Sequence, residues 1–226
     1  MGILTTKKNA GHDRDETFYF KSSDRALIIF TRNPELGKVK TRLAKKTGDR
    51  IALDIYKFLL AHTVEITREI EADKYVFYSE EIILNDLWDD GVYRKKLQQG
   101  AQLGGRMKNA FEQLFKLGYK KVMIVGSDIH ELKQLHIEQA FESLENNDIV
   151  IGPAKDGGYY LLGMNSLLPE LFEIGNWGGN TVFEDTMKAA GEATVSVLPE
   201  RNDVDYFEDI CDVEAFQPFL KSLKTK

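Results

Sequence analysis

The chain has 226 residues, of which 42% are hydrophobic and 29% charged, a composition typical of a folded protein with one substantial core. Its formal net charge of −6 argues against a nucleic-acid-binding surface, and no apolar run reaches the length of a membrane span. Cys211 is the single cysteine, which excludes an internal disulfide and a thiolate metal cluster. Because the N-terminal segment also lacks the apolar run of a secretory signal, we expect a cytoplasmic protein.

The expected elements alternate between strands and helices along the chain. Residues 1–24 are polar and read as an N-terminal extension, in which Phe18-Tyr19-Phe20 is a candidate edge strand. Short apolar runs predict strands at 26–30, 75–78, 121–125, 148–151, 159–162 and 194–198. Helical periodicity predicts helices at 40–70 with a break near Gly48, at 106–117, 132–144, 167–172 and 182–190, and from about Tyr206. Gly157-Gly158 suits a hairpin turn before the strand at 159–162.

This alternation predicts the fold class and the number of domains. Strands that alternate with helices favour a mostly parallel sheet covered on both faces, which is a three-layer α/β/α sandwich. No internal repeat, low-complexity tract or linker interrupts the pattern. We therefore predict one domain over residues 25–226.

A basic loop follows the first expected strand. Between residues 32 and 46 the only acid is Glu35, whereas the cations are Arg32, Lys38, Lys40, Arg42, Lys45 and Lys46. Cations at a helix N-terminus oppose the helix dipole, but a bound phosphate reverses that cost because the free N–H groups and the cations then converge on one anion. The alternative is a solvated basic face. The segment matches neither a P-loop nor a Gly-x-Gly-x-x-Gly fingerprint, which disfavours a nicotinamide-dependent oxidoreductase.

A second basic helix start follows a glycine-rich segment. Leu103-Gly104-Gly105 precedes Arg106, and glycine permits close approach of a backbone to a ligand. Arg106 is thus a candidate contact for a phosphate or a base. The alternative is a glycine-rich connector that carries a surface arginine.

Carboxylates stand where several expected strands end. Asp128 follows the strand at 121–125, the clearest buried strand of the pattern, and His130 lies two residues further on, so the two are candidate ligands of Mg²⁺ or Mn²⁺. Asp156, Asp203 and Asp205 also lie at the ends of strands, and such ends gather along one edge of a parallel sheet. Helix capping is the competing explanation, because Asp128 and Asp205 each precede a glutamate at capping-box spacing.

A set of aromatic and small residues is the candidate acceptor pocket. Aromatic rings can stack on a sugar or a base, and glycines leave room for a ligand beside the backbone. Hairpin and helix-capping roles explain the same residues without a ligand. The residues of this candidate pocket are Gly157, Gly158, Tyr159, Trp177 and Thr181.

Three motifs in the same order carry a resemblance to a known family. They are Ile29 to Leu43, Gly126-Ser127-Asp128, and Gly152 to Leu161. Across about residues 25–215 the chain resembles a bacterial family of glycosyltransferases, defined as a domain of unknown function and associated with arsenosugar-type biosynthesis. That family is placed in the nucleotide-diphospho-sugar transferase superfamily, which has the GT-A fold.

The resemblance implies a nucleotide held by the loop from Thr31 to Arg42, which includes Asn33, and a metal held at Asp128. The segment from Asp203 to Asp205 is similar to the C-terminal aspartate that supplies a second metal ligand in related nucleotidyltransferases, and Asp205 is the first choice for that role. One departure stands out, because the family has Cys-Pro where this chain has Ile129-His130. Either Asp128 and His130 form an Asp-x-His metal pair, or metal binding is weakened.

Three activities remain open at this stage. In a metal-dependent glycosyltransferase with a nucleotide-sugar donor and a small-molecule acceptor, Lys38 neutralises the leaving nucleoside diphosphate and Asp156 is the general base. In a nucleotidylyltransferase, the same loop binds a nucleoside triphosphate and pyrophosphate leaves. A non-catalytic nucleotide-binding module is the alternative of another class. The primary prediction is glycosyl transfer.

Overall fold

The computed structural model describes residues 21–223, which form one seven-stranded sheet in the order β3-β2-β1-β4-β6-β5-β7. All neighbouring strands pair in parallel except at β6, which is antiparallel to both β4 and β5. The strands are β1 (Arg25–Thr31), β2 (Asp73–Tyr78), β3 (Tyr93–Leu97), β4 (Lys121–Gly126), β5 (Ile149–Pro153), β6 (Tyr159–Met164) and β7 (Val195–Val197).

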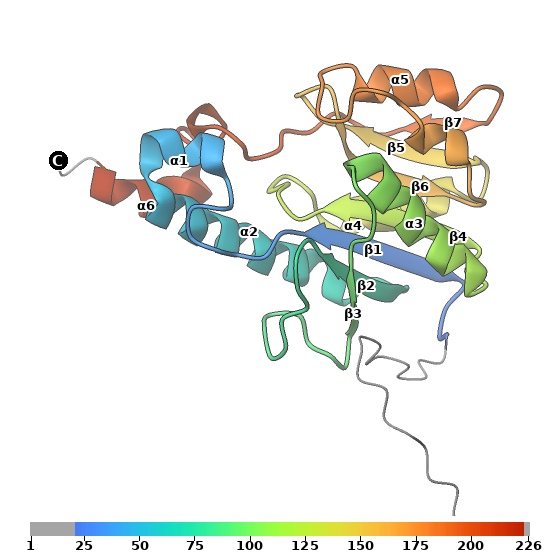
Figure 1. The fold of residues 1–226 in the computed structure, drawn as a ribbon, viewed down its shortest axis with the longest axis horizontal. Helices are drawn as coiled ribbons and strands as arrows, with labels where there is room; N and C mark the ends of the chain where they lie inside the picture. Colours follow the sequence, from blue (N-terminus) through green and yellow to red (C-terminus); the bar gives the residue numbers. More distant parts are fainter. Residues whose placement is uncertain (1–20, 224–226) are drawn as a thin grey trace, which may run out of the picture.

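Helices cover both faces of this sheet (Figure 1). The α-helices are α1 (Thr41–Thr47), α2 (Asp49–Arg68), α3 (Leu103–Lys116), α4 (Gln134–Ser143), α5 (Val182–Ala189) and α6 (Gln217–Leu220). Short 3-10 turns are η1 (Pro169–Phe172), η2 (Phe207–Asp209), η3 (Glu214–Phe216) and η4 (Lys221–Leu223). The three-layer α/β/α sandwich with a mostly parallel sheet is therefore confirmed. No helix within residues 21–223 is long and apolar enough to cross a membrane.

The alternation of side chains along β1 explains the three layers. Leu27 and Ile29 pack into a core shared with α2 and α4, whereas Ala26 and Ile28 pack into a second core shared with α3. Successive strand residues point to opposite faces, so a strand buried on both sides must be apolar throughout. The continuous run from Ala26 to Ile29 meets that requirement.

A third apolar cluster builds a lobe beside the sheet. Leu43 of α1 and Ile55 of α2 pack against Val204, Ile210 and Phe216 of the C-terminal segment. Figure 1 shows α1, α2 and α6 together on one side of the molecule, next to the carboxyl end of β1. This packing brings the loop after β1 and the C-terminal segment to the same end of the sheet.

The strand order creates a crevice between β1 and β4. The chain leaves β1 towards β2 on one side, and β4 later joins β1 on its other side. At such a reversal the flanking connections diverge, and ligands of open α/β sheets bind outside the carboxyl ends of the strands there. The expected loop at 31–42 and the expected carboxylate Asp128 follow these two strands.

Several local expectations differ from the structure. The stretch between residues 79 and 105 contains β3, which sequence periodicity missed because its sequence is largely basic. The hairpin partner of β5 is β6 as expected, but β6 also inserts between β5 and β4. The helix expected at 167–172 is the 3-10 turn η1, and the helix expected from Tyr206 is replaced by short turns before α6. Phe18-Tyr19-Phe20 and most of the N-terminal extension lie outside the described residues.

Candidate active site

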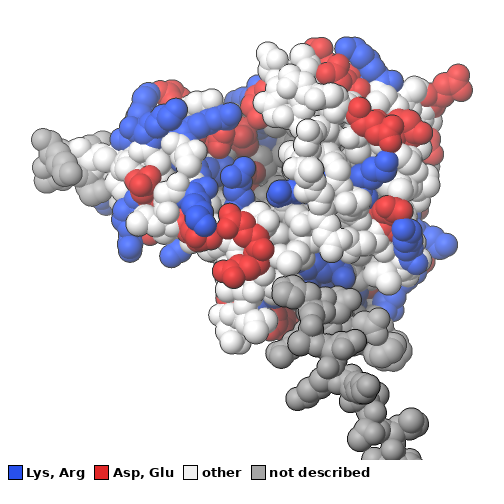
Figure 2. Space-filling model, viewed as in Figure 1, with Lys and Arg blue, Asp and Glu red and all other residues white. Residues whose placement is uncertain are grey.

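A pocket of about 880 Å³ opens at the carboxyl ends of β1 and β4. Figure 2 shows basic and acidic side chains gathered around a hollow between the α1 lobe and the rest of the molecule. Its volume is in the range of clefts that hold small molecules and cofactors. The lining includes Thr31, Arg32, Asn33, Lys38, Lys40, Arg42, Tyr56, Ser79, Glu80, Gln98, Arg106, Ser127, Asp128, Asp156 and Asp205. All seven residues expected to contact the nucleotide are therefore gathered in one pocket.

Tyr56 of α2 holds the first part of the basic loop in place. Its hydroxyl accepts a hydrogen bond from the backbone N–H of Arg32 at 2.9 Å and lies 3.2 Å from the hydroxyl of Thr31. It also lies 3.4 Å from the hydroxyl of Ser127, which follows β4. One phenol thus connects the ends of β1 and β4. Tyr56 falls within the helical periodicity, which gave no sign of this role.

Asn33 fixes the opposite side of the loop. Its amide nitrogen donates to the carbonyl of Glu81 at 2.8 Å, and its amide oxygen accepts from the backbone N–H of Glu80 at 3.1 Å. The residue is buried, with 4% of its surface exposed. Asn33 therefore lines the pocket, but its side chain is committed to joining two loops of the protein.

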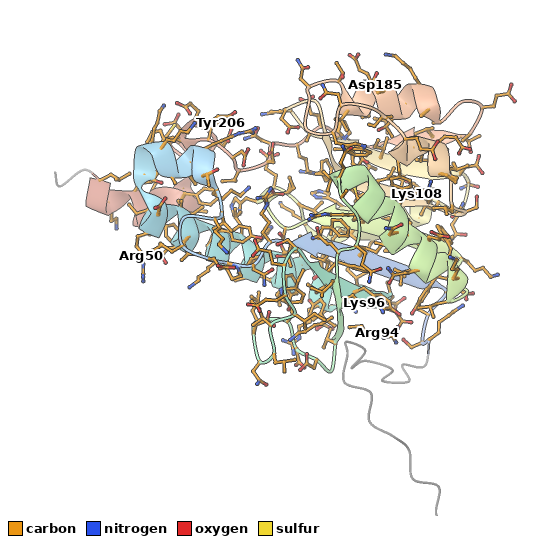
Figure 3. The ribbon with its side chains drawn as sticks, viewed as in Figure 1. Arg50, Arg94, Lys96, Lys108, Asp185 and Tyr206 are labelled. Carbon is orange, nitrogen blue, oxygen red and sulfur yellow. The ribbon has the colours of Figure 1, made fainter. Side chains whose placement is uncertain are left out.

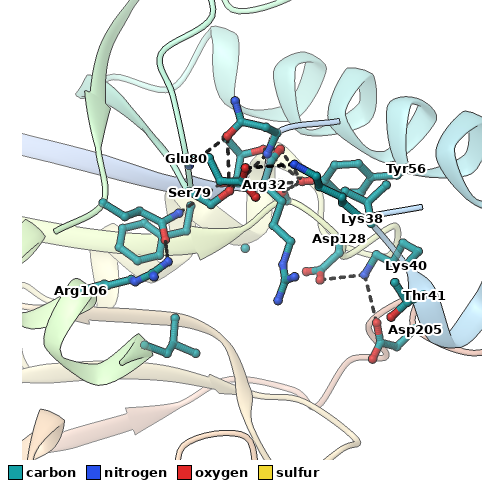
Figure 4. Close-up of a pocket in the computed structure, with 18 of the residues that line it drawn as sticks. Arg32, Lys38, Lys40, Thr41, Tyr56, Ser79, Glu80, Arg106, Asp128 and Asp205 are labelled. Carbon is teal, nitrogen blue, oxygen red and sulfur yellow. Dashed lines mark hydrogen bonds and ion pairs between the residues drawn. The ribbon is translucent and has the colours of Figure 1, made fainter. Parts of the chain in front are cut away.

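An ion-pair network spans the centre of the pocket (Figure 4). The ammonium of Lys40 lies 3.0 Å from Asp128 Oδ2 and 3.4 Å from Asp205 Oδ1. Arg42 contacts the other oxygen of Asp205 at 2.7 Å, and its guanidinium lies over the ring of Tyr206, which Figure 3 shows beside α1. Burial lowers the pKa of Lys40, but the two carboxylates outweigh it and raise that pKa above its ordinary value. Lys40 is thus a charged ammonium.

Asp203 adds a third carboxyl to this region. Burial, together with the negative charges of Asp128 and Asp156, raises the pKa of Asp203 to about 6. Sequence reasoning placed Asp203 among the strand-end carboxylates without giving it a site role. The shift identifies a region in which negative charge is already in excess, and such a region favours an added cation.

The remaining cations lie around the rim of the pocket. Lys38 pairs with Glu35 at 2.7 Å and with Glu80 at 3.4 Å. Arg106 donates to the carbonyl of Gly100 at 3.0 Å and to Gln98. Arg32 extends into the pocket in Figure 4, and its guanidinium has no ion pair within residues 21–223. Arg32 is therefore available to a bound anion.

His130 takes a different place from the one predicted. Its ring packs 5.0 Å from the ring of Phe216, 5.6 Å from that of Phe58 and 5.1 Å from that of His62, measured between centroids. Burial lowers its pKa, and its Nδ1 is buried without a hydrogen-bond partner among the described residues. His130 does not line the pocket. The prediction of an Asp-x-His pair is wrong in this structure, because the aromatic contacts draw the ring into the lobe.

None of the five residues predicted for the acceptor pocket lines this cavity. Tyr159 packs against Trp177 with ring centroids 6.4 Å apart, and its hydroxyl contacts the sulfur of Met107. The indole of Trp177 covers Gly104 so closely that a β-carbon there would meet it at 2.2 Å. These partly buried aromatic rings therefore pack against each other and the α3 core, away from the pocket, which corrects the prediction of a sugar or base platform there.

A turn and a side-chain hydrogen bond account for the others. Gly157 has a positive φ of 90° and lies against the backbone of Asn180, while the Gly158 N–H donates to Asp156 at 2.8 Å. Thr181 donates to Asp185 at 2.9 Å, at the start of α5. Asp156 itself does line the pocket.

The donor set limits how a metal can bind. No group of three or more histidine, cysteine, aspartate or glutamate side chains in metal-binding geometry occurs within residues 21–223. Asp128 and Asp205 share one cation, the ammonium of Lys40. Mg²⁺ typically binds one or two carboxylates and takes its other ligands from water and substrate phosphates. The residues fit a metal that arrives with a nucleotide, but they do not form a complete cage.

Several pocket residues escaped sequence reasoning. Ser79 and Glu80 follow β2, and Gln98 follows β3 and donates to the carbonyls of Thr31 and Phe77. Both positions follow the carboxyl ends of strands that run parallel to β1, so they lie at the same edge of the sheet as the end of β1. Identification of β3 would have pointed to Gln98, because the carboxyl ends of parallel strands share an edge.

The fold and the position of the pocket define a nucleotide-diphospho-sugar transferase fold, the class expected from sequence. A crystal structure from Desulfovibrio desulfuricans G20, provisionally described as a nucleotide-diphospho-sugar transferase, superposes with a TM-score of 0.77 at 29% identity. The match covers 90% of this chain and 96% of that one. Residues 63–179 match the family described as "Uncharacterized protein conserved in bacteria (DUF2064)", and the chain belongs to that family.

Two curated relatives have a stated reaction. The chain is 25% identical over 142 residues to a 2-phospho-L-lactate guanylyltransferase of Methanocaldococcus vulcanius, which covers 62% of this chain and 61% of the relative. It is 36% identical over 72 residues to the enzyme of the same name from Methanocaldococcus jannaschii, covering 32% of this chain and 30% of the relative. The chain thus matches about three fifths or less of either relative's length.

Proposed function

We propose that the protein is a metal-dependent nucleotidylyltransferase that joins a nucleoside triphosphate to a phosphorylated small molecule and releases pyrophosphate. The observation that carries the proposal is one pocket in which Arg32, Lys38 and Lys40 face Asp128 and Asp205. Similarity to the guanylyltransferases favours nucleotidyl over glycosyl transfer, which reverses the order of the two predictions from sequence. GTP is accordingly the first nucleotide to test.

The chemistry needs charge stabilisation more than proton transfer. A phosphate oxygen of the acceptor attacks the α-phosphorus, a new P–O bond forms, and the bond to the β-phosphate breaks so that pyrophosphate leaves with the electron pair. A phosphate monoester is largely ionised at neutral pH and needs no general base. Arg32, Lys38 and Arg106 line the pocket and would stabilise the charge on the phosphates. Asp128 and Asp205 would hold a divalent metal, which would supply further positive charge to neutralise the phosphates.

Glycosyl transfer is the second candidate, and one observation supports it. Asp156 lines the pocket and its carboxylate is held by the turn at Gly158, so it is placed to act on an acceptor hydroxyl. An arsenosugar-type role, which the resemblance implies, stays a prediction. A non-catalytic module predicts nucleotide binding that does not depend on Asp128.

Product analysis tests the choice. Purified protein is incubated with each of the four nucleoside triphosphates, Mg²⁺ or Mn²⁺, and a panel of phosphorylated hydroxy acids that begins with 2-phospho-L-lactate. We expect pyrophosphate in amounts equal to a nucleotidylated product, and its loss in Asp128→Asn. A parallel panel replaces the triphosphates with nucleotide-sugars. Release of nucleoside diphosphate there, without pyrophosphate in the first panel, would overturn nucleotidyl transfer in favour of glycosyl transfer.

Nucleotide binding is tested separately from turnover. Arg32→Met removes a cation that has no ion pair in residues 21–223, so the variant should melt at the same temperature as the parent protein without ligand. It should lose most of the rise in melting temperature that a metal–nucleotide complex causes. Arg50→Met is the matched control, because Arg50 is 81% exposed on α2 and points away from the pocket in Figure 3.

A further inference from the structure

Lys40 adopts a backbone conformation that is rare for its residue type. Its φ of 46° and ψ of 44° place it in the left-handed region at the N-cap of α1, with no side-chain cap. Only Lys40 and Asn85 have positive φ among the non-glycine residues that the structure describes. A strained residue persists where the surrounding structure holds it, and such residues concentrate at ligand sites. The Lys40 side chain is 6% exposed, whereas that of Lys38 is 55% exposed.

The ammonium of Lys40 occupies the position between two carboxylates. Its side chain is only 6% exposed, whereas those of Asp128 and Asp205 are 36% and 28% exposed. Both acids therefore face the open pocket and share a cation that reaches them from beneath. A divalent ion bound by both carboxylates would lie within a few ångströms of the ammonium and be repelled by it.

We propose that Lys40 is a built-in counter-ion that keeps divalent metal off the Asp128–Asp205 pair until a nucleotide arrives. The phosphates offer the ammonium a new partner, and the two carboxylates are then free for the metal that accompanies the nucleotide. Metal alone binds weakly, so the site loads the nucleotide and its metal together. The inference rests on the metal requirement of the proposed function, but not on which group is transferred.

Charge balance around the pair supports this role. Without Lys40, the partly exposed carboxylates of Asp128 and Asp205 would face the pocket with no shared cation, and such a pair attracts divalent metal ions. Of the two acids, Arg42 pairs with Asp205 and not with Asp128, and its side chain is half exposed, which leaves Lys40 as the cation shared by both acids. If Lys40 had only a structural role, its loss would loosen the loop and weaken the binding of every ligand, including the metal. A counter-ion predicts that metal binding improves.

Direct measurement of Mn²⁺ binding without nucleotide separates these outcomes. Free Mn²⁺ is followed by electron paramagnetic resonance during titration of the parent protein and of Lys40→Met, which keeps the side-chain length and removes the charge. We expect at least about tenfold tighter Mn²⁺ binding by the variant, since a competing cation close to both ligands has been removed. Lys40→Asn is a second variant without the charge, and asparagine adopts the left-handed backbone conformation more readily than methionine. It provides the same test if Lys40→Met folds poorly.

Two further variants identify the site. Lys46→Met removes the same charge from α1, but Lys46 pairs with Glu208 outside the pocket, so Mn²⁺ binding should not change. Adding Asp128→Asn to Lys40→Met should abolish the gain. Equal Mn²⁺ affinity in the parent protein and both Lys40 variants would overturn the inference, as would tight nucleotide-free binding by the parent. The transferase proposal fails instead if no triphosphate or nucleotide-sugar is turned over.

Discussion

Asp203→Asn should stabilise the protein above neutral pH and have little effect in acid. The pKa of Asp203 is raised from 3.8 to about 6 by burial and by the charges of Asp128 and Asp156. Between these values the folded state binds a proton that the unfolded state has released, so stability falls as pH rises from about 4 to about 6. Above pH 6 the folded protein carries the full cost of ionised Asp203.

The size of this cost follows from the shift. Two pKa units correspond to about 3 kcal/mol at pH 8, and only about 0.5 kcal/mol is present near pH 4. Asparagine has nearly the same shape and no charge, so it should raise the free energy of unfolding by up to about 3 kcal/mol at pH 8. The gain should nearly vanish at pH 4.

Urea unfolding of both proteins at the two pH values measures this difference without metal or nucleotide. Asp212→Asn, an exposed aspartate outside the pocket, is the control and should leave stability unchanged at both pH values. An equal effect of Asp203→Asn at pH 4 and pH 8, or a loss of stability at pH 8, would refute the assignment of a repelled, half-buried carboxylate.

Three other substitutions test contacts around the basic loop and along α3. Tyr56→Phe removes the hydroxyl that accepts a hydrogen bond from the N–H of Arg32, so the free energy of unfolding in urea should fall by about 1–2 kcal/mol. We also expect kcat/KM to fall, because the loop is no longer held in position. An unchanged kcat/KM would contradict the role of Tyr56 in positioning the loop. Gly104→Ala should destabilise the protein by about 1–3 kcal/mol, because a β-carbon there would meet Trp177 at 2.2 Å. Gly105→Ala, with no atom within 4 Å, should stabilise α3 by about 0.5 kcal/mol, and equal melting temperatures for the two variants would show that Trp177 moves freely.

The basic loop and the carboxylates at strand ends were predictable because they depend on local patterns. A continuous apolar run from Ala26 to Ile29 predicts a central parallel strand, and parallel strands place their carboxyl ends along one edge. The residues that follow β1 and β4 must then share a crevice, whatever the details of packing. The meeting of Lys40 and Asp128 was expected on this ground, and the structure places them 3.0 Å apart.

Other features depended on contacts that no local pattern contains. Lys40 also pairs with Asp205, 165 residues away, because α1 and the C-terminal segment pack into one lobe. The helix expected at 40–70 includes Tyr56, but its pattern cannot show that the hydroxyl of Tyr56 reaches two loops. His130 stands two residues from Asp128, yet its ring turns into the aromatic contacts of that lobe.

The sequence by itself determined the layered fold, the position of the crevice and the opposite charges on its two sides, since these follow from hydrophobic period and strand direction. Tertiary packing decided which charged side chains form ion pairs, which carboxyl has a raised pKa and which aromatic side chains are buried. The physical reason is that side-chain direction and desolvation depend on neighbours from distant parts of the chain. A residue's partners therefore emerge only when the whole domain has folded.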